Sequence, residues 1–137
     1  MTNRLRVWGP AAVWAAVLFF LSALPDLDGS PLLFQGEDKV VHAGLYAVLG
    51  ATLAWGRFRS ASPPPAWVLM VLGLLYGAGD EWHQSLVAGR DPSLGDWTAD
   101  TVGVLLGYWI TSWFAELPAL PHGARRPHET KPGPQPE

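Results

Sequence analysis

Four long apolar segments dominate the 137-residue sequence and limit the folds that it can adopt. They cover about residues 7–24, 38–56, 66–88 and 96–115. A helix that crosses the hydrocarbon core of a bilayer needs about 20 mostly apolar residues, and each segment has about that length. Only 15% of the residues are charged, against roughly 25% in soluble domains. We therefore expect an all-α fold, a four-helix transmembrane bundle within residues 1–116.

The basic residues predict how this bundle is oriented. Cytoplasmic segments of membrane proteins are enriched in Lys and Arg. Four crossings would place seven of the nine basic residues on one side and leave only Lys39 and Arg90 on the other. We expect both termini to be cytoplasmic, in a multi-pass membrane protein. The first segment also resembles a secretory signal, but no small-residue cleavage site follows it, which favours a retained helix.

Composition restricts the remaining possibilities. Residues 117–137 contain six Pro and several charges, so we expect a disordered cytoplasmic tail. The sequence has no Cys, which rules out disulfides and thiolate metal sites. The net charge of −3 is small, and no basic patch indicates a nucleic-acid partner.

Polar residues interrupt three of the four segments near the end that this topology places outside. Helical spacing aligns them in stripes, because residues four apart lie on one face. His42 leads to Tyr46 and a glycine on the second segment, and Asp100 leads to two glycines on the fourth. Small residues let membrane helices approach closely. We therefore expect these stripes to face one another, with the carboxylates in a shared interior.

The third segment carries the acids that are hardest to explain as surface residues. Asp80 and Glu81 lie about two turns before the expected helix end, and their short side chains cannot reach water easily. An intramembrane carboxylate is by default a functional-site hypothesis. Adjacent helical residues point about 100° apart, so we expect only Asp80 to face the centre. Glu81 would then pair with Arg90 or Lys39.

These residues resemble the VanZ-like family of small bacterial integral membrane proteins. The resemblance rests on "DKVVHAGLYAVLG" and "YGAGDEWHQSLVAGRDPSLGDWTADTVG", in that order, within a four-helix layout. Asp100 occupies a position where the family more often has Asn. The resemblance implies a multi-pass protein of the bacterial cytoplasmic membrane. It also implies a role in tolerance of the glycopeptide antibiotic teicoplanin and in cell-envelope chemistry. It does not bring a settled reaction or substrate.

The candidate site residues come from all three polar clusters. They are Asp38, His42, Asp80, Glu81, Gln84, Arg90, Asp96 and Asp100. Some have simpler explanations. Asp38 can cap the second helix, Ser93 and Asp96 can form a capping box, and Arg90 after Gly89 can end the third helix. The whole set can also be a buried ion-pair network that only holds the helices together.

Three functional classes follow from the site. In an enzyme, Asp80 and Asp100 would be the acid and the base, His42 would carry protons, and Arg90 would hold a phosphate. No cofactor is evident, although a divalent cation on Asp80, Asp100 and His42 is a variant of this class. In a recognition protein, the polar cleft would bind a membrane lipid, a lipid-linked envelope precursor or the glycopeptide antibiotic, or it would engage another membrane protein. Transport is disfavoured because the inner halves of the helices lack polar residues.

Overall fold

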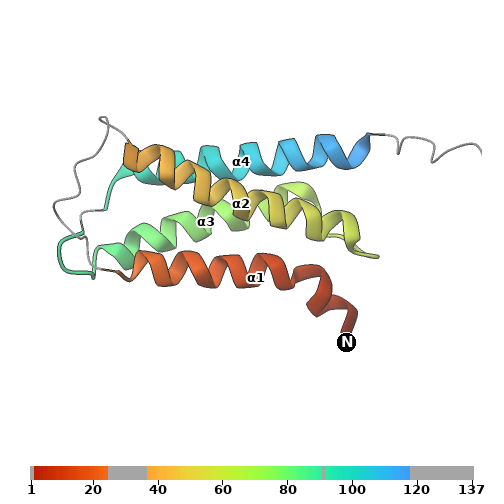
Figure 1. Cartoon of the computed structure of the whole chain (residues 1–137), viewed down its shortest axis with the longest axis horizontal. Helices are drawn as coiled ribbons and strands as arrows, with labels where there is room; N and C mark the ends of the chain where they lie inside the picture. Colours follow the sequence, from red (N-terminus) through yellow and green to blue (C-terminus); the bar gives the residue numbers. More distant parts are fainter. Residues whose placement is uncertain (1, 25–36, 91, 118–137) are drawn as a thin grey trace, which may run out of the picture.

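The computed structural model describes residues 2–24, 37–90 and 92–117, which form four helices (Figure 1). These are α1 (Thr2–Ser22), α2 (Glu37–Arg59), α3 (Ala66–Gln84) and α4 (Leu94–Glu116). No strand occurs within those ranges, so the all-α fold and the four helices are confirmed. Apart from Leu117, the predicted disordered tail lies outside the described residues.

The helix ends differ from the expected ones where polar residues extend or stop a helix. α1 begins at Thr2 rather than near residue 7, since polar residues before the apolar run are helical as well. α3 ends at Gln84 rather than near residue 88, and Gly89 adopts a φ of 80° in the turn that follows. α4 begins at Leu94 because Ser93 is its N-cap. The Ser93 Oγ accepts hydrogen bonds from two backbone N–H groups of the first turn.

The four helices alternate in direction along the bundle (Figure 1). α1 and α3 run one way, and α2 and α4 run the other way, so α2 and α4 are parallel to each other. One end of the bundle therefore gathers the starts of α2 and α4 and the ends of α1 and α3. This end holds the polar clusters that lie far apart in the sequence.

Glycines bring α2 and α4 into close backbone contact. A Cβ atom added to Gly103 would overlap the backbone carbonyl of Ala43, and one added to Gly107 would overlap that of Ala47. Gly50 on α2 meets the backbone of Val104 in the same way. The predicted stripes on these two helices thus face each other, with the acidic residue Asp100 near one end of the contact.

α1 packs on α2 and α3, and hydrogen bonds from side chains to backbone oxygens join it to both helices. The Trp14 Nε1 donates to the carbonyl of Leu45 on α2 at 2.8 Å. The Tyr76 hydroxyl of α3 donates to the carbonyl of Ala15 at 2.6 Å. Between these bonds lies an apolar core formed by four buried residues of α1, α2 and α4, namely Leu18, Tyr46, Leu49 and Val104.

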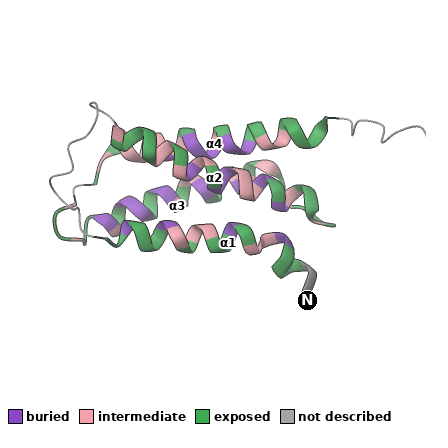
Figure 2. Ribbon diagram, viewed as in Figure 1, coloured by how far each residue is buried: buried purple, intermediate pink, exposed green. Residues whose placement is uncertain are grey.

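Exposed positions occur on all four helices (Figure 2), and many of them carry large apolar side chains. Large exposed side chains include Phe20, Leu75, Trp82, Leu106 and Trp109. The buried set contains four acidic or amide side chains, so polarity is partly inverted relative to a protein folded in water. Among the described helices, only α1, over Arg4–Ser22, is long and apolar enough to cross a membrane by length and composition alone.

Candidate functional site

An exposed ion-pair cluster lies at the end of the bundle where α2 and α4 begin. The Lys39 Nζ lies 3.0 Å from a carboxylate oxygen of Asp38 and 3.0 Å from one of Asp96. Asp38 and Lys39 are both exposed, whereas Asp96 is only partly exposed. The predicted cap by Ser93 is present, but Asp96 does not complete a capping box. Its carboxylate turns across to α2 instead.

One helical turn further into the bundle, a second pair joins the same two helices. The His42 Nδ1 lies 2.9 Å from the Asp100 Oδ1. Asp100 is 1% exposed, and its Oδ2 is enclosed without a hydrogen-bond partner among the described residues. The imidazole side chain remains 17% exposed, so His42 connects the buried carboxylate with the outer end of the site. A carboxylate that orients an imidazole in this way is a frequent arrangement in acid–base catalysis.

α3 contributes two buried carboxylates, whereas the sequence predicted that only Asp80 would face the interior. Both Asp80 and Glu81 are under 9% exposed. Asp80 accepts a hydrogen bond from the Gln84 amide at 3.3 Å. Glu81 accepts one at 2.7 Å from the backbone N–H of Ser93. One oxygen of each carboxylate is buried without a partner in the described part of the chain.

The expected ion pairs of Glu81 are therefore wrong. Neither Lys39 nor Arg90 forms an ion pair with Glu81 in the described part of the chain. Glu81 instead accepts from the backbone N–H of Ser93. In a capping box, Asp96 would accept from that N–H group. Glu81 thus joins the end of α3 to the N-cap residue of α4. Both acids lie where the start of α4 packs against the second half of α3, and the spacing within one helix does not reveal this contact.

Arg90 lies in the turn between α3 and α4, at the same end of the bundle. It is half-buried, and its Nε is enclosed with no hydrogen-bond partner among the residues described. It forms no ion pair with any described carboxylate.

The structure brings His42, Glu81 and Asp100 together most closely. One ligand-type atom of each lies within 4.8 Å of the others, although the three residues belong to three different helices. Asp80 and Gln84 form a neighbouring pair on α3, and the pairing of Asp80 with Asp100 as acid and base stays a prediction. Asp38 and Asp96 lie at the outer edge with Lys39, and Arg90 lies apart in the turn.

Tyr46 belongs with this site although it was not a candidate residue. It is 1% exposed, one turn after His42, and its hydroxyl has no hydrogen-bond partner in the described ranges. Its ring lies 6.3 Å from that of Tyr76, centroid to centroid. The signal in the sequence was the spacing of four residues from His42, which places both on one helix face.

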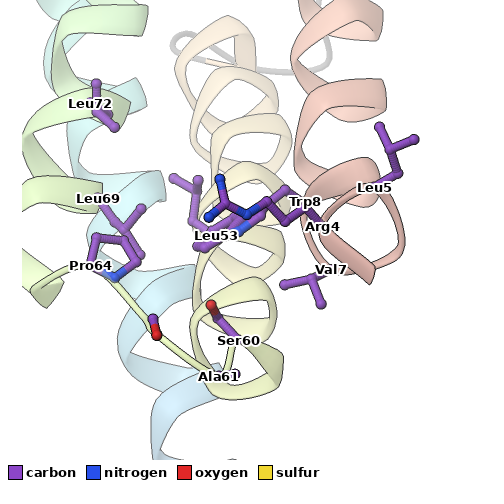
Figure 3. A pocket seen from close by; sticks show the side chains of 11 residues that line it. Arg4, Leu5, Val7, Trp8, Leu53, Ser60, Ala61, Pro64, Leu69 and Leu72 are labelled. Atoms are coloured by element: carbon purple, nitrogen blue, oxygen red, sulfur yellow. The ribbon is translucent and has the colours of Figure 1, made fainter. Parts of the chain in front are cut away.

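A separate cleft lies at the opposite end of the bundle (Figure 3). It has a volume of about 1160 Å³ and lies between α1, the end of α2 and the start of α3. Its walls are mostly apolar, with Arg4 and Ser60 among the few polar residues. No carboxylate lines it, so this cleft does not share the chemistry of the acidic end.

The fold and the site define a class of small all-helical proteins with an apolar exterior and a cluster of acids and one imidazole inside one end. The family model described as VanZ/LLP1 matches residues 7–115, and the chain belongs to this membrane-associated family. The match covers α2 and α3, most of α1 and α4, and every candidate site residue. No curated protein and no solved structure matches the chain.

Proposed function

We propose that this protein is a multi-pass membrane protein whose buried site binds and chemically modifies the polar part of a cell-envelope lipid or lipid-linked precursor. The observation that carries the proposal is the His42 and Asp100 pair, which lies beside two further buried carboxylates. In this arrangement Asp100 orients the imidazole, and His42 takes a proton from a substrate hydroxyl or from water.

Four spans are supported by the helix lengths and the surface. Helices of 19 to 23 residues are about 29–35 Å long at 1.5 Å per residue. That length matches a hydrocarbon core of about 30 Å. The exposed apolar side chains suit lipid, and exposed Trp residues lie near both ends, as interfacial Trp residues do. The basic residues of α1 and of the last turn of α2 share one end, which we assign to the cytoplasm.

The assigned orientation places the acidic end at the outer leaflet. A substrate there would present its head group to His42, which is the exposed edge of the buried cluster. Arg90, which forms no ion pair with a described carboxylate, suits the phosphate that many envelope lipids carry. By its family, we also propose that the protein contributes to tolerance of teicoplanin.

The ion pairs argue against a network that only holds the four helices together. Within the described residues, the pairs that join different helices are Lys39 with Asp96 and His42 with Asp100. Both join α2 to α4, and these helices already contact each other closely through glycines. A network that secured the bundle would also join α1 to the other helices by ion pairs, and it would balance its acids.

The test compares lipid extracts of bacteria with and without the protein, and of bacteria that produce Asp100→Asn at a matched level. We expect one lipid class to change when the protein is present and to return to the background level in the variant. Glu116→Gln, an exposed acid at the far end of α4, is the matched control. An unchanged lipid profile, or a change that Asp100→Asn retains, would contradict the proposal. Loss of the folded variant from the membrane would support the structural alternative.

A further inference from the structure

We infer that His42, Glu81 and Asp100 form a binding site for one divalent transition-metal cation of the Zn²⁺ type. The three residues come from α2, α3 and α4, and one ligand-type atom of each lies within 4.8 Å of the other two. All three side chains therefore converge on one point between the helices. The inference deepens the proposed function and rests on it only for the reaction, because binding of the ion needs no substrate.

The spacing fits a shared ion. Zn²⁺ binds imidazole nitrogen and carboxylate oxygen at about 2.0–2.2 Å, so two ligands of one ion lie about 3–4.4 Å apart. The 2.9 Å between the His42 Nδ1 and the Asp100 Oδ1 is just below this range, because these two atoms now contact each other directly. A small outward movement of either side chain would place the ion between them, with Glu81 as the third ligand.

Unpartnered oxygens supply the independent reason to expect a ligand. Asp100 is 1% exposed and Glu81 is 8% exposed, and each has one oxygen without a hydrogen-bond partner among the residues described. The free Asp100 Oδ2 lies on the side of α3, because it would be 3.5 Å from a Cβ atom at Gly77. Glu81 is one turn further along that helix. Buried carboxylates without partners are costly, and a cation would satisfy both.

The charge around the site also favours a cation. Asp80 adds a third buried carboxylate beside the cluster, and its Oδ1 has no partner within the described ranges. The nearest ammonium group, that of Lys39, already pairs with Asp38 and Asp96 at the outer edge. His42 is the only basic side chain that bonds directly to these buried acids in the described part of the chain. A divalent ion would offset the excess.

The ligand set indicates the class of ion and its use. Imidazole nitrogen suits Zn²⁺ better than Ca²⁺ or Mg²⁺, which prefer oxygen ligands alone. Three protein ligands leave a coordination position open for water or substrate, as in catalytic rather than structural zinc sites. The ion-held water would then be the base in place of the imidazole, and His42 would be a ligand.

The experiment uses the full chain, purified in detergent, stripped with a chelator and reloaded with Zn²⁺. Elemental analysis should give about one Zn²⁺ per chain. Glu81→Gln and Asp100→Asn should weaken binding by more than the roughly 10–100-fold that changes outside the ligand shell cause. Glu116→Gln should bind as the unaltered protein does. Co²⁺ in place of Zn²⁺ should give the visible absorption of a site with low coordination number.

A folding control keeps the two variants informative. Zn²⁺ should raise the thermal unfolding midpoint of the unaltered protein and of Glu116→Gln, but not that of folded Glu81→Gln. If Glu81→Gln does not fold, His42→Gln replaces it in the same titration. The inference would be overturned if the unaltered protein bound no Zn²⁺. It would also be overturned if Glu81→Gln, Asp100→Asn and His42→Gln all retained Zn²⁺ binding.

Failure of the inferred metal site can be distinguished from failure of the proposed function. If the protein binds no ion but the lipid change still requires His42 and Asp100, the metal site is wrong and the function stands. If one Zn²⁺ binds through the three residues but no lipid changes, the metal site stands and the function is wrong.

Discussion

The Nδ1 of His42 on α2 lies 2.9 Å from the Oδ1 of Asp100 on α4, and this contact joins residues 58 positions apart in the sequence. It is possible because the two helices run parallel and begin at the same end of the bundle. The pair lies one turn inside the Lys39 and Asp96 pair, which links the same helices. Two successive polar contacts therefore lead from the exposed edge to a carboxylate that is almost completely buried.

We predict that His42 and Asp100 act as one functional unit. His42→Gln and Asp100→Asn should each lower the lipid change by roughly 10²–10⁴-fold, the range for loss of acid–base or ligand groups. The double variant should be about as active as the less active single variant, since the effects of changing residues that act together are not additive. Extracts from cells with matched protein levels measure this. Independent, multiplying effects would contradict a shared role.

We predict that Gly107→Ala destabilises the bundle by about 1–3 kcal/mol or more, as overpacking in a close interface does. The new methyl group would overlap the backbone carbonyl of Ala47, which cannot move without the helix. Gly44→Ala is the matched control, because no atom lies within 4 Å of a Cβ at that position. Thermal unfolding in detergent should separate the two. Equal midpoints would mean that α2 and α4 lie further apart.

The sequence predicts the helices and the faces on which their polar residues lie, but not how one helix covers another. The four helices follow from runs of apolar residues, and the joint face of His42, Asp100 and the glycines follows from spacing by four. The burial of Glu81 does not follow, since it depends on how α4 covers the end of α3. Its bond to the backbone of Ser93 is equally invisible in a pattern of side chains. Tertiary packing determines which residues of different helices pair, whereas the spacing within one helix determines which residues share a face.

We predict that Ser93→Ala weakens the start of α4 by about 1 kcal/mol, the usual cost of losing an N-cap side chain. The Ser93 Oγ accepts from the N–H groups of Gly95 and Asp96, and both would lose this partner. Thr98→Ala, in the next turn, removes only an exposed hydroxyl bond to a helix carbonyl and should have a smaller effect. Unfolding by a denaturing detergent measures the difference. If Thr98→Ala destabilises the protein as much as Ser93→Ala does, loss of the N-cap is not the cause of the effect.

We predict that the acidic end of the bundle faces the outside of the cell. The chain has no Cys, so single Cys residues report their own position. Leu94→Cys suits the acidic end because Leu94 is 83% exposed and leaves the Ser93 cap intact. Ser62→Cys, exposed in the link between α2 and α3, suits the other end. A membrane-impermeant maleimide should label Leu94→Cys in intact cells and Ser62→Cys only after permeabilisation. The opposite pattern would place His42 and Asp100 at the cytoplasmic leaflet, where an outer-leaflet lipid could not reach them.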